Sequence, residues 1–71
     1  MIVTPESPLA GRSLSEERFA ERFGLIVVGI RSPREHHGWQ REHLTSRQLS
    51  PGDILLLQGD ADAAREAQRE G

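Results

Sequence analysis

Three histidines and two glutamates fall within one short stretch of the chain, and residues of these types can bind a metal ion. The histidines are His36, His37 and His43, with Glu35 and Glu42 beside them. A metal site needs three or four ligands that converge at about 2 Å from the ion. Adjacent side chains of an extended segment point to opposite faces, so only one of His36 and His37 could join His43. The pattern therefore favours surface histidines, and we expect no metal or other cofactor.

The same stretch concentrates positive charge. Residues 31–47 carry four arginines against two glutamates, a net charge of +2, whereas the whole chain carries −2. An anion would be attracted to this segment, although a solvated loop of mixed charge explains the composition equally well. Trp39, the only tryptophan, lies in the same segment. It either pins this segment to a sheet or serves at an interface or in ligand stacking, roles in which tryptophan is enriched.

Other chemistries find little support. No serine stands in the G-x-S-x-G pattern of a nucleophile elbow, and neither a P-loop nor a G-x-G-x-x-G fingerprint is present. The chain is acidic and has few aromatic residues, which argues against nucleic-acid binding. The longest apolar run, residues 25–30, is far shorter than the ~20 residues of a membrane span. We therefore expect no enzyme, no nucleic-acid partner and no direct membrane insertion.

Turn and cap signals divide the first part of the chain into short elements. Residues 1–4 predict a strand, which the following proline ends because proline lacks a ladder donor. Ser13 and Glu16 form a capping-box pattern, which predicts a helix over 14–23. Gly24 stands where a left-handed C-terminal cap is expected. The apolar face of this helix would consist of Leu14, Phe19, Ala20 and Phe23.

The most apolar segment, residues 25–30, predicts a strand that is buried on both faces or paired across a subunit interface. A weak alternation over 39–44 predicts a short edge strand. A chain of this size buries little of its surface, so pairing with a second copy would stabilise it. The residues expected at such a dimer interface are Ile26, Val28, Ile30 and Trp39.

Stronger signals organise the C-terminal part. Residues 50–53 place proline and glycine at the central positions of a type II turn. A strand over 54–57 follows, and Asp60 is a suitable N-cap for a helix over 61–69. The order β-α-β-β-β-α predicts an α+β domain, with a mainly antiparallel sheet and helices packed on one face.

Three segments in this order form a recognisable set. They are S-P-L-A-G-R-S-L at 7–14, R-F-G-L-I-V-V-G-I-R at 22–31 and L-S-P-G-D-I-L-L-L-Q-G at 49–59. They resemble the opening, core and closing motifs of the TrkA-C domain, also called the C-terminal lobe of RCK domains. The three segments together span about three quarters of the chain, which makes the resemblance more specific than any one motif.

This resemblance implies a cytosolic regulatory domain of a potassium channel, a cation transporter or antiporter, or a related permease. Such domains form homodimers and act on a membrane transporter or channel subunit through a nucleotide-binding lobe or the pore itself. Residues 1–71 are accordingly expected to form a single domain, excised from a larger transport protein and placed on the cytosolic face of the membrane. A small anionic or nucleotide ligand would change how two such domains pack.

Four arginines are candidates for binding this ligand: Arg22, Arg31, Arg34 and Arg41. Family members that bind cyclic di-AMP tend to carry an arginine four residues before the helix-ending glycine, where this chain has Ala20. Two hypotheses remain open. One is a ligand sensor that holds an anion near Arg31 at a dimer seam, and the other is a structural homodimerisation module of an anion permease without a ligand. Arginines that converge across a two-fold axis would favour the first.

Overall fold

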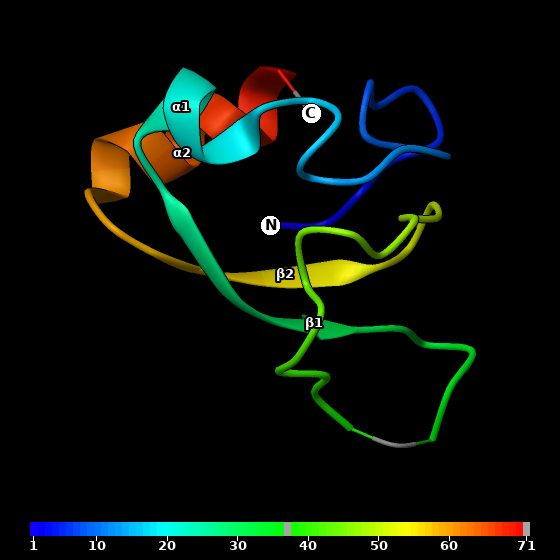
Figure 1. Cartoon of the computed structure of the whole chain (residues 1–71). Coiled ribbons are helices and arrows are strands. Elements are labelled where there is room, and N and C mark those ends of the chain that lie inside the picture. Colours follow the sequence, from blue (N-terminus) through cyan, green and yellow to red (C-terminus); the bar gives the residue numbers. More distant parts are fainter. Residues whose placement is uncertain (37, 71) are drawn as a thin grey trace.

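A two-stranded antiparallel sheet lies at the centre of the fold. A computed structural model of the chain describes residues 1–36 and 38–70. The elements in chain order are α1 (Phe19–Phe23), β1 (Ile26–Arg31), β2 (Ile54–Gln58) and α2 (Ala61–Glu70). Both helices lie on the same side of the sheet, and irregular segments surround its other end (Figure 1). The predicted α+β class, with helices on one face, is confirmed.

The N-terminal segment lies beside β2. Ile2 forms an antiparallel bridge with Ile54, so the strand predicted over 1–4 is reduced to a single bridge. The neighbouring Val3 is buried, and its N–H donates to the carbonyl oxygen of Asp53 at 2.9 Å. The amide of Gln68 in α2 also binds the backbone of Ile2, as donor to its carbonyl at 3.2 Å and as acceptor from its N–H at 2.9 Å. The first and last parts of the described chain therefore touch.

At the other edge of β1, Gln40 is the one described residue that pairs with this strand. Gln40 and Ile30 exchange two backbone hydrogen bonds of 2.7 and 2.9 Å. The edge strand predicted over 39–44 is therefore wrong beyond this bridge. Gly38 and His43 both have positive φ angles, 74° and 58°, which do not fit an extended strand.

The first helix is shorter than predicted. The helix expected over 14–23 is wrong before Phe19, because Arg18 adopts a left-handed conformation with φ 51° and interrupts it. In a continuous helix Leu14 and Phe19 would point about 140° apart, and only one of them could face the core. The interruption allows both side chains to be buried, while Ala20 is exposed.

The capping box itself is confirmed. The N–H of Ser13 donates to Oε1 of Glu16 at 3.0 Å, and the N–H of Glu16 donates to Oγ of Ser13 at 3.1 Å. It caps the turns that lead into α1 rather than α1 itself. The hydrogen bonds with the backbone and the side chain of Ser13 lower the pKa of Glu16 below its ordinary value of 4.5.

This lowered pKa predicts an acid-sensitive contribution to stability. Because the folded state favours the carboxylate, the contribution is present above the unfolded pKa of Glu16 and is lost as the pH falls through the lower, folded value. We expect Glu16→Gln, which keeps a capping-box side chain, to lose less stability than the wild type between about pH 6 and about pH 3. Urea unfolding at several pH values measures this. A difference between the two proteins that stays constant over that range would contradict the prediction.

Gly24 ends α1 as predicted. Its backbone is left-handed, with φ 67° and ψ 28°, and its N–H donates to the carbonyl oxygen of Ala20 at 2.8 Å. A Cβ atom added at Gly24 would meet no atom within 4 Å. Any cost of a side chain at this position therefore comes from the backbone conformation rather than from a steric clash.

We expect Gly24→Val to lower the free energy of unfolding by about 1 kcal/mol or more, because a β-branched residue strains the left-handed conformation. Gly24→Asn is the matched control, since asparagine tolerates this conformation and should cost less. Thermal unfolding compares the two variants with the wild type. An unchanged melting temperature for the valine variant would show that the backbone adjusts without strain.

The apolar strand predicted over 25–30 is confirmed as β1, shifted by one residue. A β-bulge lies between Val27 and Gly29, where the register against β2 changes. Burial along β1 is uneven, since Ile30 is completely buried whereas Ile26 is 59% exposed. Within one chain, the end of β1 that contains Ile26 therefore remains partly open to solvent.

The turn and the second helix follow the sequence signals. The N–H of Asp53 donates to the carbonyl oxygen of Ser50 at 3.1 Å, and Gly52 has the positive φ, 95°, of a type II turn. Oδ1 of Asp60 accepts hydrogen bonds of 2.7 and 3.3 Å from two N–H groups in the first turn of α2. This helix packs through small side chains, and Ala67 is completely buried.

The core lies between the inner face of the sheet and the elements that cover it. Its buried apolar residues are Val3, Leu9, Leu14, Phe19, Leu25, Ile30, Leu49, Leu55 and Ala67. Several of them belong to irregular segments, so hydrophobic burial holds those segments against the sheet. Among the described residues, no helix has the length and apolar content needed to cross a membrane.

Candidate functional site

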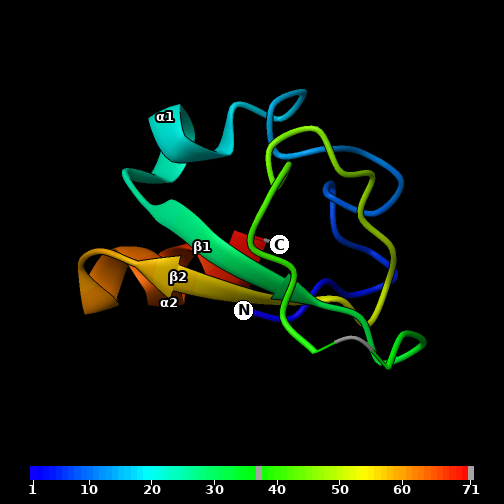
Figure 2. The same ribbon diagram turned by 60° about the horizontal axis from the view of Figure 1, so that its bottom comes forward.

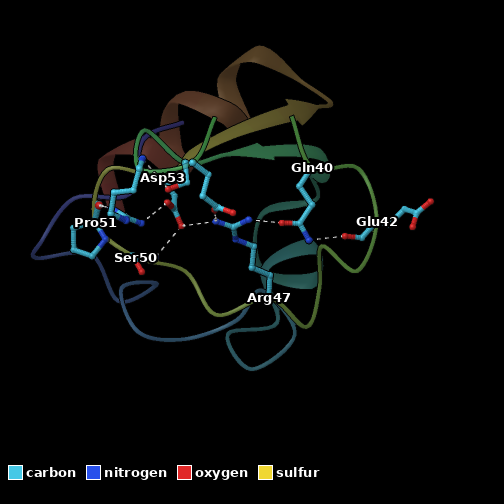
Figure 3. Close-up of polar contacts among 9 residues, drawn as sticks. Gln40, Glu42, Arg47, Ser50, Pro51 and Asp53 are labelled. Carbon is cyan, nitrogen blue, oxygen red and sulfur yellow. Dashed lines mark hydrogen bonds and ion pairs between the residues drawn. The ribbon is translucent and has the colours of Figure 1, made fainter. Parts of the chain in front are cut away.

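A buried carboxylate organises the basic segment. Asp53 is completely buried after the type II turn, and its Oδ2 accepts the N–H of Ser50 at 2.9 Å. Arg34 donates from Nη2 to Oδ1 of Asp53 at 3.0 Å, and Nη2 of Arg47 lies 3.9 Å from Oδ2. Figure 3 shows Arg47 between Asp53 and Gln40. Two of the four arginines in residues 31–47 are thus neutralised inside the chain.

The same network holds the residue that pairs with β1. Arg47 donates to Oε1 of Gln40 and, at 2.7 Å, to Oε1 of Glu35. The side-chain amide of Gln40 donates to the carbonyl oxygen of Glu42 at 2.8 Å (Figure 3). These contacts fix Gln40 opposite Ile30, so the ion pairs of Asp53 determine where the basic segment meets the sheet.

Two other arginines remain available. In the described part of the chain, Arg31 and Arg41 are the arginines that form no ion pair and no side-chain hydrogen bond. Each directly follows one residue of the Ile30–Gln40 bridge, and both are exposed. Because Ile30 points into the core, its neighbour Arg31 points to the opposite face of the sheet.

Trp39 lies on that opposite face. A Cβ atom at Gly29 would lie 3.3 Å from Cε3 of Trp39 and 3.8 Å from Cβ of Leu56. The half-buried indole ring therefore packs over the glycine, close to Leu56. This contact fits an aromatic side chain that pins the basic segment to the sheet. We call Arg31, Trp39 and Arg41 the basic face.

The four predicted ligand arginines do not meet in one place within the chain. Arg22 belongs to α1, where it forms ion pairs with Glu17 at 3.4 Å and Glu70 at 3.7 Å. Its guanidinium also lies 5.0 Å from the centre of the Phe23 ring. Arg34 is held by the buried carboxylate, which leaves Arg31 and Arg41 as exposed cations on either side of the antiparallel Ile30–Gln40 bridge.

The residues predicted for a dimer interface also divide into two groups. Ile30 is completely buried in the core of its own chain. Ile26 is exposed, and Val28 and Trp39 are half-buried. Two further large apolar side chains are exposed that the sequence did not single out, Ile2 at 51% and Leu56 at 42%.

A cavity of about 350 Å³ opens between α1 and β1. It is lined by Leu14, Ser15, Arg18, Phe19, Ala20, Glu21, Leu25, Ile26, Val27 and Thr45. Its two charged residues neutralise each other, because Nε of Arg18 donates to Oε2 of Glu21 at 3.0 Å. The cavity therefore suits apolar groups better than a charged ligand. The continuous helix predicted over 14–23 did not indicate this cavity.

The histidines gather no further ligands in the described residues. His36 and His43 are both exposed, while His37 lies outside the described residues. Within the described ranges, no group of three or more His, Cys, Asp or Glu side chains is arranged to hold a metal ion. The functional residue that sequence reasoning missed is Asp53, which it treated only as part of a turn. Its position directly before an apolar strand was the available signal.

Comparison with known proteins agrees with this architecture. The TrkA-C domain family matches residues 1–70. An uncharacterized transporter from Synechocystis sp. is 33% identical over 63 residues, which are 89% of this chain and 10% of the transporter. The chain thus spans about a tenth of the length of that relative. No solved structure matches the chain. Because the family match includes both helices and both strands, this chain belongs to the TrkA-C domain family.

Proposed function

We propose that this chain is the regulatory domain of a membrane ion transporter, and that it acts on the cytosolic side as a homodimer that responds to a small anionic ligand. The TrkA-C family match and the transporter relative support a transporter as the parent protein. The resemblance favours potassium or another cation as the transported ion. The observation that carries the ligand response is the pair of arginines, Arg31 and Arg41, that have no ion-pair partner among the residues the structure describes.

The chemistry of the basic face suits a phosphate or carboxylate. Each of the seven other arginines already has a carboxylate partner, as Arg12, Arg18 and Arg22 illustrate. An anion that bound Arg31 and Arg41 would therefore not have to displace a carboxylate of the described residues. Guanidinium groups bind both kinds of anion in bidentate geometry, and the neighbouring indole ring of Trp39 offers a face for a planar group such as a nucleotide base.

Binding at this position would couple two segments of the chain. Arg31 belongs to β1, whereas Arg41 belongs to the segment that meets β1 through the Gln40 bridge and the packing of Trp39 over Gly29. An anion shared by both arginines would hold that segment against the sheet. Such a ligand shifts the packing of two domains only as far as it binds one arrangement more tightly than the other.

Cyclic di-AMP recognition of the kind the resemblance suggests has no arginine at the expected position. Ala20 stands there, on α1, and lines the apolar cavity rather than the basic face. The positively charged residue of the cavity lining, Arg18, is already bound to Glu21. Mononucleotides, phosphate and small carboxylates are therefore better probes of the basic face than a ligand that depends on that arginine.

Thermal melting against a panel of these anions tests the proposal. A ligand at about 100 times its Kd raises the free energy of unfolding by about 2.7 kcal/mol, which is a readily measured increase in melting temperature. We expect Arg31→Gln and Arg41→Gln to lose this increase. Arg65→Gln is the matched control, since Arg65 is an exposed arginine of α2 that pairs with Asp62.

The alternative is a structural homodimerisation module of an anion permease without any ligand. The uncharged, partly exposed part of β1 favours it, because such a surface serves assembly whether or not a ligand binds. A panel without any increase in melting temperature, recorded on a protein that is clearly dimeric, would select this alternative. An increase that all three arginine variants retain would place the ligand elsewhere on the domain.

A further inference from the structure

The side chain of Gln40 lies behind the basic face. Gln40 pairs with Ile30 close to the end of β1 (Figure 2). Residues directly opposite each other in an antiparallel pair point to the same side of the sheet, and Ile30 is completely buried in the core. The side chain of Gln40 therefore lies on the core side, whereas the next residue, Arg41, is exposed and belongs to the basic face.

Arg47 holds the side chain of Gln40 from the core side. Its guanidinium donates from Nη1 to Oε1 of Gln40 and from Nη2 to Oε1 of Glu35 at 2.7 Å. The same Nη2 lies 3.9 Å from Oδ2 of the buried Asp53 (Figure 3). Only 18% of the Arg47 side chain is exposed. Since both ends of its fork already have acceptors, Arg47 is not itself available to an anion on the basic face.

Gln40 in turn fixes the backbone on both sides of Arg41. Its own N–H and carbonyl group form hydrogen bonds of 2.7 and 2.9 Å with Ile30. Its side-chain amide donates to the carbonyl oxygen of Glu42 at 2.8 Å. Arg41 lies between these two anchored residues, so its position relative to β1 depends on the side chain of Gln40.

We propose that Arg47 is a positioning residue for the anion site of the basic face, and that it acts through Gln40 without touching the anion. This inference rests on the anion response proposed above. An anion that needs both Arg31 and Arg41 binds only while the segment that contains Arg41 is held against β1. The measured Kd rises as the fraction of molecules in that arrangement falls. Arg47 raises this fraction because it ties Gln40 to the carboxylate of Asp53, which is buried directly before β2.

The choice of substitution separates positioning from charge, since any nearby cation also attracts an anion. Arg47→Lys keeps the positive charge, but a lysine ammonium cannot replace the planar fork that binds Gln40 and the carboxylates together. Gln40→Met changes no charge and removes both hydrogen bonds of the glutamine side chain. Arg34→Lys is the matched control, because Arg34 binds the same Asp53 at 3.0 Å but donates its other hydrogen bond to Pro51 rather than to Gln40.

Calorimetric titration of the chain with inorganic phosphate and with AMP measures the Kd. We expect Arg47→Lys and Gln40→Met each to raise the Kd about 2- to 30-fold, the range for residues that change affinity without contacting the ligand. Arg34→Lys should leave the Kd unchanged. Both lysine variants weaken an ion pair of Asp53, so a general loss of stability would not produce this difference.

The emission of Trp39 gives a second measurement that needs no ligand. Trp39 is the only tryptophan of the chain and lies on the basic face, so its fluorescence reports how the segment is held against β1. We expect Arg47→Lys and Gln40→Met to shift the emission to longer wavelength, because the indole ring becomes more exposed to water. Arg34→Lys should not shift it, and circular dichroism verifies that each variant is folded.

A double variant tests whether Arg47 acts through Gln40. If it does, combining Arg47→Lys with Gln40→Met raises the Kd no more than the stronger single change does. Independent effects would instead multiply. A multiplied increase would therefore show that Arg47 influences the anion by another route and would overturn the inference.

The remaining outcomes distinguish this inference from the proposed function. A wild-type chain that binds neither probe would overturn the anion response and the positioning role with it. A wild-type chain that binds, and loses affinity in Arg41→Gln but in neither Arg47→Lys nor Gln40→Met, would overturn the positioning role alone. An equal rise of the Kd in Arg34→Lys and Arg47→Lys would also overturn it. If Arg47→Lys does not fold, Gln40→Met decides, because it leaves the ion pairs of Asp53 in place.

Discussion

Replacing Asp53 with alanine is expected to remove about 3 kcal/mol from the free energy of unfolding, because a completely buried carboxylate loses its charge-assisted hydrogen bonds. The change leaves the N–H of Ser50 without its acceptor and releases Arg34 and Arg47 from their shared partner. Since Arg34 is largely exposed, water can solvate it, which keeps the loss below that of two fully buried charges. A domain of this size has a total stability of about 4–10 kcal/mol, so the loss is a large part of it.

Urea unfolding of a pair of asparagine variants tests the charge itself. Asp53→Asn keeps the shape and an acceptor for Ser50 but removes the negative charge, so we expect about half the loss of the alanine variant. Asp60→Asn is the control, because asparagine caps a helix as well as aspartate does and should leave stability nearly unchanged. Equal effects of the two asparagine variants would show that the network around Asp53 contributes little.

Phe19→Ala is expected to cost about 3–5 kcal/mol, the usual range for deleting a buried aromatic ring. Phe19 is 2% exposed, and its ring centre lies 5.0 Å from that of Phe23. It is the first residue of α1 and also lines the cavity beside β1. One wall of the cavity, β1, is also held by its backbone pairing with β2, which limits how far the site can collapse after the ring is removed.

Phe23→Ala is the matched control for this prediction. Phe23 is half-buried at the end of the same helix, so removing it should cost clearly less. Thermal and urea unfolding of both variants give the comparison, and the same samples report whether a wider cavity changes dimerisation. A larger loss for Phe23→Ala than for Phe19→Ala would mean that α1 is held mainly by its exposed end.

Elements determined by neighbouring residues could be predicted from the sequence. Ser13 and Glu16 bind each other within one turn, Gly24 supplies a left-handed cap, and Asp60 caps the helix that follows it. In each case the hydrogen bonds join residues no more than four positions apart. The types of one or two neighbouring residues were therefore enough to predict the local structure.

The interruption before α1 could not be predicted in the same way. Residues 14–18 carry nothing that excludes a helix, and Arg18 is a good helix former. The left-handed conformation of Arg18 allows both Leu14 and Phe19 to be buried. The hydrophobic burial of these two side chains offsets the cost of that conformation. Tertiary packing therefore outweighed local preference at this position.

The basic segment depends on contacts between distant parts of the chain. Arg34 and Asp53 are 19 residues apart and meet only because the sheet brings the two segments together. A charge count showed that an anion would be attracted to this segment, but it could not show which arginines an internal carboxylate already holds. The apolar residues of β1 were ambiguous in a similar way. A strand buried within its own chain and a strand buried against a second copy require the same apolar pattern.

The hydrogen bonds between Gln68 and the backbone of Ile2 have a consequence for how such a domain is carried by a longer chain. Because these residues touch, a polypeptide can enter the domain and leave it at almost the same point. Protein segments of this kind are tolerated as insertions within a loop of a host protein, since they hardly alter the host's path. A domain with this geometry can be gained, lost or moved between host proteins without rebuilding the rest of their structure.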